Sequence, residues 1–335
     1  MGEWHLIETL VPDVATVVAS NGKIREWNSV ARLAPAKDLR IEPVVSYVRE
    51  TRTKFDKVLM SQARSKESFH VQAVPVLGPS GDTHGVQVWI GEPDEEIPHP
   101  RICSGVSWLR DKLIIAQTLE SSLMSGVTPE EFHPEATVVE YLNRSAHFQE
   151  ESSFLELGAN PEPGQKWHSQ FAVKHNAGHL MQWQCALRTY PDPAQRGWRV
   201  LFHDITDTYP VAKPTLAQIG MTEGMKHAGY RVALIDTVNG LLGMWISAPV
   251  DWMQWEDTDI HGNVFHDDDR PALASVRARF EAGEEEVLLR LRLRSTSGDF
   301  VATNVRLTPY LVEGADDMNG ALIQISANRD VEAFN

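Results

Sequence analysis

Histidine and aspartate side chains form the groups in this sequence that could bind a metal ion or exchange a proton. His168, His175 and His179 lie near one another, and residues 267–269 are consecutive aspartates. Imidazole nitrogens ligate zinc, and carboxylate oxygens ligate hard cations. No cysteine or carboxylate completes a site with the histidines, and aspartates before a helix also cap its N–H groups and offset its dipole. Solvated histidines and capping aspartates are therefore favoured over metal binding, and we assign no metal ligands.

A second group of side chains indicates binding rather than catalysis. Trp245, Trp252 and Trp255 could line an apolar ligand pocket, although a plain core is the favoured interpretation. Leucines two residues apart in a strand point the same way, so those within residues 287–294 should share this interior. The residues expected to line it, as a core or as a ligand pocket, are Trp245, Leu289, Leu291, Leu293, Val305 and Leu307.

Arginines fill the alternate positions of the same segment. Arg290, Arg292 and Arg294 should point away from the leucines, because burying them unpaired would carry a large free-energy cost. On a chain with a formal charge of −15 they form a local basic stripe. A solvated face paired with acidic neighbours is favoured, and a docking face for an acidic helix or a second subunit is the functional alternative.

A weak threefold repeat of strands and turns positions these side chains. The expected strands are residues 69–77 and 85–90, then 170–174, 180–190 and 197–202, then 287–294, 300–311 and 320–325. Gly85, Gly197 and Gly320 hold one position in the three copies. A repeat of roughly 110–120 residues is too long for a solenoid unit and indicates tandem whole domains.

Hairpins and helices are expected ahead of these strands. Asn21-Gly22 predicts a hairpin over residues 17–27, and a second hairpin is expected over 232–247. Helical spacing extends over residues 44–59, and Pro271 fits the start of a helix that ends near residue 280. A further helix is expected over residues 216–227.

Polar, proline-containing linkers divide the chain at residues 92–100 and 208–214. The predicted domains are therefore residues 1–97, 98–211 and 212–335. The fold class expected is α/β, more narrowly α+β, with three tandem domains that each hold an antiparallel sheet flanked by helices. Each domain runs as two strands, helices and then three antiparallel strands.

This order of elements resembles the PAS domain. Residues 18–28 are similar to the opening hairpin of that family, which often ends in Trp-Asn, and residues 202–206 to its Asp-Ile-Thr closing segment. Residues 264–270 resemble its His-Pro-Asp-Asp-Arg stretch, with Asp267 in place of proline. The whole chain also resembles actinobacterial proteins with PAS-like modules. The resemblance implies small-ligand binding between helices and sheet, or protein binding at the outer sheet face.

Cofactors that PAS domains use would need particular side chains. Cys103 and Cys185 do not stand in the Asn-Cys-Arg-Phe-Leu-Gln context of flavin photochemistry, and Cys185 is expected in the core. His147 is the candidate axial ligand for haem, which usually comes from a helix flanking the pocket. We expect no cofactor.

Charge and composition limit the partners. The 46 acidic and 31 basic residues predict repulsion of phosphate backbones and anionic lipids, so neither nucleic acid nor membrane is an expected partner. No apolar run reaches transmembrane length, and the start of the chain does not resemble a secretory signal. With two cysteines, the cytoplasm is the expected compartment.

These observations predict a cytoplasmic sensory or scaffold protein of PAS type. It would act through a small apolar ligand, through contacts with an unknown protein or through both, and it shows no Walker, kinase or nucleophile-elbow motif of an output domain. Self-association as a dimer is expected through helical segments that precede the second or the third copy, of which residues 216–227 are the better case. The alternative is an enzyme with an active site between domains, which would need convergent titratable groups.

Overall fold

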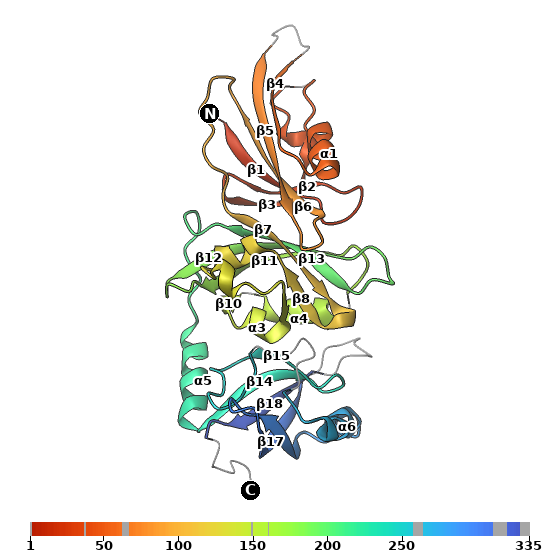
Figure 1. Ribbon diagram of the computed structural model, residues 1–335, viewed down its shortest axis with the longest axis vertical. Helices are drawn as coiled ribbons and strands as arrows, with labels where there is room; N and C mark the ends of the chain where they lie inside the picture. Colours follow the sequence, from red (N-terminus) through yellow and green to blue (C-terminus); the bar gives the residue numbers. More distant parts are fainter. Residues whose placement is uncertain are drawn as a thin grey trace. The chain divides into compact units, whose positions relative to one another are not determined.

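The computed structural model describes residues 2–36, 38–61, 67–148, 150–159, 161–256, 264–310 and 320–328. Over these residues the protein is a mixed α/β structure with three mainly antiparallel sheets (Figure 1). Contacts divide the chain into two compact units, which are described separately. Unit 1 holds residues 1–134, 146–149 and 162–212, and unit 2 holds residues 135–145, 150–161 and 213–335. None of the described helices is long and apolar enough to cross a membrane.

The first sheet of unit 1 has the strand order β3-β2-β1-β6-β5-β4. Its strands are β1 (Glu3–Glu8), β2 (Thr16–Ser20), β3 (Lys23–Ser29), β4 (Phe55–Met60), β5 (Ser68–Leu77) and β6 (Thr83–Gly91). A 3-10 turn, η1 (Val30–Leu33), follows β3, and helix α1 (Glu42–Thr51) packs against β4, β5 and β6. Val44, Val45 and Val48 of α1 share an apolar core with the inner face of this sheet.

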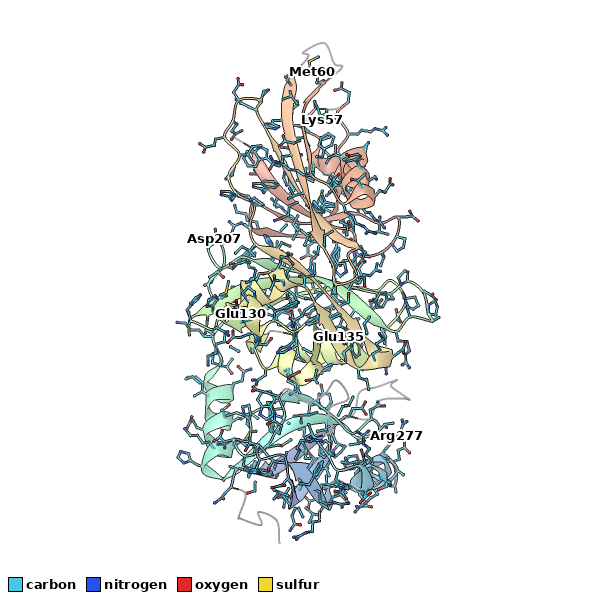
Figure 2. The ribbon with its side chains drawn as sticks, in the orientation of Figure 1. Lys57, Met60, Glu130, Glu135, Asp207 and Arg277 are labelled. Carbon is cyan, nitrogen blue, oxygen red and sulfur yellow. The ribbon has the colours of Figure 1, made fainter. Side chains whose placement is uncertain are left out.

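The opening hairpin of this sheet is confirmed, and the length of the predicted helix is wrong. Asn21 and Gly22 both adopt positive φ angles (47° and 77°) between β2 and β3, as an Asn-Gly hairpin turn requires. The helix expected over residues 44–59 ends at Thr51, because Arg52 adopts a left-handed conformation with φ 58°. The rest of that segment forms β4, which pairs with β5 at the sheet edge and leaves Met60 exposed (Figure 2).

The strands of the second sheet that belong to unit 1 run in the order β10-β11-β12-β13-β7-β8. These strands are β7 (Cys103–Leu109), β8 (Ile114–Gln117), β10 (Ser145–Phe148), β11 (Lys166–Lys174), β12 (Leu180–Thr189) and β13 (Gly197–Asp204). The 3-10 turn η2 (Arg110–Lys112) links β7 to β8. Helix α2 (Leu119–Met124) and the 3-10 turn η3 (Pro129–Glu131) follow β8 in the chain. Of these, α2 packs against β7.

The outer faces of these two sheets pack against each other. Apolar side chains of the first sheet and its loops form one cluster with Ala186 of β12 and Leu201 of β13. The first sheet and its loops contribute Leu6, Leu10, Val18, Ala19 and Val76. The approach is close, because a Cβ added at Gly85 would lie 2.6 Å from Cδ1 of Leu201. Strand β12 is consequently buried on both of its faces after its first residue.

Unit 2 contains the third sheet, with the order β15-β14-β18-β17-β16. Its strands are β14 (Tyr230–Asp236), β15 (Leu241–Trp245), β16 (Val287–Arg294), β17 (Phe300–Tyr310) and β18 (Gly320–Ser326). The unit also holds β9 (Glu135–Thr137), α3 (Val138–Leu142), α4 (Glu151–Ala159), α5 (Leu216–His227), η4 (Asp267–Asp269) and α6 (Arg270–Glu281). Helix α6 contributes Leu273 and Val276 to the core of the unit, and α3 contributes Val139.

Helix α5 occupies the predicted residues and stands apart from that core. Thr215 and Gln218 form a capping box at its start. None of its residues is buried, and the large apolar side chains of Leu216, Ile219 and Met221 are exposed.

One strand order recurs in all three sheets. Taken from the second strand of each opening pair, the orders are β2-β1-β6-β5-β4, β8-β7-β13-β12-β11 and β15-β14-β18-β17-β16. In each shared set of five, two strands come early in the chain and three close the sheet, with helical segments between the two groups. Strand β3 of the first sheet and strand β10 of the second lie outside this shared set. The repeat seen in the sequence is therefore a repeat of topology, while the division at residues 97 and 211 stays a prediction.

Candidate ligand-binding and docking surfaces

The predicted pocket residues lie together on the inner face of the third sheet. Leu291 and Leu293 of β16 and Val305 and Leu307 of β17 are fully buried in one apolar cluster with Trp245 of β15. Leu289 is partly buried and packs against this cluster. Strand pairing sets this arrangement, because Leu289 lies opposite Val305 in the antiparallel register. Ligand binding by this interior stays a prediction.

The tryptophans of unit 2 differ in how their indole N–H groups are satisfied. The rings of Trp245 and Trp255 meet edge to face, with centroids 6.0 Å apart. The Nε1 of Trp252 donates to the carbonyl oxygen of Ser326 at 3.2 Å. The Nε1 of Trp245 is buried and has no hydrogen-bond acceptor among the described residues. Buried N–H groups are normally paired, so Trp245 offers a donor that a ligand acceptor could use.

The arginine stripe points away from the core as expected, but Arg292 already has partners. Its Nη2 lies 2.7 Å from Oδ1 of Asp269 and 3.1 Å from Oδ2 of Asp268. The hydrogen bonds from Arg292 hold the pKa of Asp269 below its ordinary value. Arg294 lies over the ring of Phe300, with Cζ 5.2 Å from the centroid. For Arg292 the solvated, acid-paired interpretation therefore fits better than a docking role.

The aspartate run before α6 does not cap that helix in the expected way. Asp269 occupies the N-cap position, yet its side chain makes no cap hydrogen bond. Its carboxylate instead accepts the backbone N–H of Arg292 at 2.7 Å, which joins the start of α6 to β16. His266 supplies the cap of η4, because its Nδ1 accepts from the N–H of Asp268.

The histidines and cysteines form no shared centre in the part of the chain that the structure describes. His175 and His179 stack across a turn with centroids 4.3 Å apart, whereas Nδ1 of His168 accepts from Trp27. No group of three or more potential metal ligands occurs among the described residues. Burial raises the pKa of both thiols, those of Cys103 and Cys185, and Cys185 lies in the core as expected. The side chain of His147, on β10, lies outside the described residues.

A buried ion pair joins the first two sheets, and the sequence did not indicate it. Glu8 of β1 is fully buried, and its Oε1 accepts from Nε and Nη2 of Arg188 at 3.0 and 2.9 Å. Thr16 donates to the same oxygen, and the N–H of Leu10 donates to Oε2 at 3.1 Å. Arg188 also lies 4.9 Å from the ring centroid of Trp27, a residue with φ 50°.

Further polar side chains satisfy one another in the same interface. Gln184 of β12 donates to the carbonyl oxygen of Val18 at 2.8 Å, and its Oε1 lies 3.1 Å from Nδ1 of His203. Burial lowers the pKa of His203 to about 3, so this imidazole is neutral. His84 is also fully buried, with Nδ1 3.1 Å from the carbonyl oxygen of Val200. The two sheets are thus held by hydrogen bonds as well as by apolar contact.

A groove on the first sheet's domain lies beside α1. Its volume is about 560 Å³. Glu42, Val45, Ser46, Arg49 and Glu50 of α1 form one wall, and residues 13–15 and 29–31 form the other. None of these residues had been singled out from the sequence, since the two walls come from separate segments of the chain.

Comparison with known proteins places the chain in a family. No curated protein matches it. A crystal structure of a protein from Mycobacterium tuberculosis, described as uncharacterized, matches with a TM-score of 0.78 and 22% identity over 98% of this chain and 97% of that one. A sensory box histidine kinase/response regulator from Burkholderia thailandensis matches at 14% identity with a TM-score of 0.25, covering 32% of this chain and 79% of that one.

An RNA-binding light-oxygen-voltage receptor matches at 9% identity with a TM-score of 0.26, covering 69% of this chain and 97% of that one. The likeness to the Mycobacterium tuberculosis protein shows a shared fold, whereas the likenesses to the histidine kinase and to the light-oxygen-voltage receptor are too weak to show one. Two family models also match, described as "Rv3651-like, N-terminal" over residues 3–99 and "Rv3651-like, C-terminal domain" over residues 215–334. The chain therefore carries both the N-terminal and the C-terminal domain of the Rv3651-like family.

Proposed function

We propose that this protein is a cytoplasmic sensory or scaffold protein of PAS type, which binds a small ligand, a protein partner or both. The observation that carries the proposal is the order that five strands share in each of the three sheets, two early strands and three closing strands with helical segments between them. That order accompanies the Trp-Asn and Asp-Asp-Arg segments that resemble the PAS family.

The ligand-binding part of the proposal rests on the interior of unit 2. An apolar face beside the indole N–H of Trp245, which has no acceptor among the described residues, suits a mostly apolar ligand with a hydrogen-bond acceptor. The ligand would lie against Leu291 and Leu307, whose side chains are fully buried in the same cluster.

The partner-binding part rests on the surfaces that remain. The outer faces of the first two sheets cover each other, so they are not available to a partner. Helix α5 instead exposes Leu216, Ile219 and Met221, and a 12-residue helix with no buried side chain is marginally stable alone in water. Association of two copies through α5 would bury these side chains.

The enzyme alternative gains no support from the buried histidine of unit 1. Nε2 of His84 lies 3.6 Å from Oδ2 of Asp82, too far for a hydrogen bond, and burial lowers the pKa of His84. A Cβ added at Gly78 would lie only 2.1 Å from that nitrogen. The backbone therefore occupies the space in which a substrate would have to approach.

Native mass spectrometry of the protein purified from its own host would test the proposal, because it reports bound small molecules and oligomeric state together. We expect a bound molecule, a dimer or both, and a Trp245→Phe variant should lose the bound molecule more readily. The matched control is Trp252→Phe, whose N–H already has an acceptor. A ligand-free monomer from host extract would count against the proposal.

A further inference from the structure

Two buried histidines link the first sheet to the second. Nδ1 of His84 in β6 lies 3.1 Å from the carbonyl oxygen of Val200 in β13. Nδ1 of His203 in β13 lies 3.1 Å from Oε1 of Gln184, whose amide nitrogen donates to the carbonyl oxygen of Val18 in β2 at 2.8 Å. Each imidazole therefore belongs to a hydrogen-bonded path that crosses the interface between the two sheets.

These partners hold both rings in the neutral form that carries its proton on Nδ1. A carbonyl oxygen can only accept, so Nδ1 of His84 is the donor in its bond to Val200. Gln184 turns its oxygen towards His203 because its nitrogen already donates to Val18, so Nδ1 of His203 is a donor as well. An added proton would therefore have to bind to Nε2 of either ring.

A proton on Nε2 of His84 would find no acceptor. The side chain is fully buried, and Nε2 has no hydrogen-bond partner among the described residues. The backbone of Gly78 fills the space beside it, because a Cβ added there would lie 2.1 Å from Nε2. Two charged groups act on this ring: Asp82, whose Oδ2 lies 3.6 Å from Nε2, and Arg199, whose Nη2 lies 3.2 Å from the same oxygen. The carboxylate is thus already paired, and burial lowers the pKa of His84.

His203 is disfavoured as a cation for the same reason. Its side chain is buried, which is the main cause of a pKa of about 3. Arg101 repels a charge on the ring and Asp207 attracts it, but these two residues pair with each other. The Glu8–Arg188 pair of the same interface is likewise closed on itself. A proton on either histidine therefore adds an uncompensated positive charge between the sheets.

We propose that the interface between the first two sheets is an acid-sensitive lock, which opens when His84 and His203 take up protons. In the open form both rings would be solvated and would bind protons as ordinary imidazoles do. Opening would expose the apolar outer faces that now cover each other, among them Leu6 and Leu201. The first sheet would keep its separate core with α1 on its other face. The lock goes beyond the proposed ligand and dimer and depends on neither.

The direction and size of the pH dependence follow from the number of bound protons. The pKa of each histidine is lowered in the closed form, so the open form binds more protons once the pH falls below the ordinary imidazole value of about 6.5. The equilibrium constant for opening should therefore rise as the pH falls, by up to about tenfold per pH unit for each histidine and about a hundredfold for both. Carboxylates with ordinary pKa values stay ionised between about pH 7 and pH 5.

The test is thiol labelling of the full chain over that pH range with 4,4′-dithiodipyridine, which reacts with thiols in mild acid. Each rate is divided by that of a cysteine in an unstructured peptide at the same pH. Cys103 packs against the apolar cluster between the sheets. Cys185 is buried on the opposite face of β12, because Gln184 and Ala186 on either side of it face the first sheet. We expect labelling of Cys103 to accelerate as the pH falls, while Cys185 stays slow, each thiol being identified by mass spectrometry of peptides.

Variants of the histidines assign the protons. His84→Gln and His203→Gln each remove one proton-binding ring and should reduce the acceleration to about tenfold per pH unit or less, and the double variant should abolish it. The measured quantity is the dependence of the rate on pH, so a variant that loosens the interface equally at every pH remains informative. His99→Gln, at an exposed position of unit 1, is the matched control and should leave the pH dependence unchanged.

Three results would overturn the inference. The first is a corrected rate for Cys103 that does not change with pH, and the second is an acceleration that persists in the double variant. The third is equal acceleration at Cys185, because it would indicate that the second sheet itself unfolds. None of these results bears on the Trp245→Phe experiment in unit 2, so the proposed function would be judged separately.

Discussion

Removal of Arg188 should destabilise the protein more than any single exposed substitution. Arg188→Met would leave the Glu8 carboxylate buried with the hydroxyl of Thr16 and the N–H of Leu10 as its donors. Breaking a buried pair by removing one partner costs about 3–5 kcal/mol, because a desolvated charge is left uncompensated. Glu8→Leu should cost a similar amount, because it leaves the guanidinium of Arg188 without its carboxylate on a side chain that is only 10% exposed.

The double variant, Glu8→Leu with Arg188→Met, separates lost packing from the stranded charge. Replacing both ions by apolar groups is often neutral, so the remaining cost is about 1–3 kcal/mol for each of the two donors that lose their acceptor, the hydroxyl of Thr16 and the N–H of Leu10. The double variant should therefore be more stable than Glu8→Leu alone, which strands the guanidinium as well as the same two donors, and its cost should fall below the sum of the two single costs, about 6–10 kcal/mol.

Urea unfolding followed by tryptophan fluorescence, with circular dichroism as a second probe, would measure these free energies. Arg277→Met removes an exposed pair with Glu281 and is the matched control, with an expected cost of about 0.5 kcal/mol or less. A loss below about 1 kcal/mol for Arg188→Met, or additive losses in the double variant, would refute the reasoning.

Three further outcomes are expected. Leu291→Ala should lower the free energy of unfolding by about 2–5 kcal/mol if the interior of unit 2 is packed, whereas a smaller loss together with ligand-raised Tm would indicate a cavity. Asp269→Asn should destabilise the protein near neutral pH but not in strong acid. Hydrogen bonds from Arg292 lower the pKa of Asp269 in the folded state, so the stability that its carboxylate contributes is lost as the pH falls through the folded-state pKa. An equal loss of unfolding free energy at both pH values would contradict this. Replacing Leu216 and Ile219 together by glutamate should convert a dimer into a monomer in sedimentation, and a monomeric parent protein at tens of micromolar would show that α5 does not mediate association.

Features that depend on neighbouring residues could be predicted from the sequence. The Asn21-Gly22 turn, the limits of α5 and the alternation of leucine and arginine in β16 all follow from local dihedral or periodic preferences. Strand β4 was missed because its apolar residues also fit a helical period. The stop signal of α1 was Arg52 in a left-handed conformation, where a glycine is more usual.

The interface between the first two sheets could not be predicted, because its contacts join distant parts of the chain. Glu8 and Arg188 are 180 residues apart, and Gln184 and Val18 are 166 apart. Alternating polar residues on β12 indicate one solvated face when the strand is considered alone. That face is covered by the first sheet, so the polar residues are buried and paired instead.

The mutual covering of the first two sheets has a consequence for synthesis of the chain. The first sheet is complete at Gly91, yet Ala186 and Leu201, which cover its outer apolar face, emerge more than 90 residues later. At about 5–20 residues per second, that face stays uncovered for roughly ten seconds on a translating ribosome. The nascent chain should therefore bind ribosome-associated chaperones until β13 has been made, and its folding should be slow because these pairings are so distant in sequence.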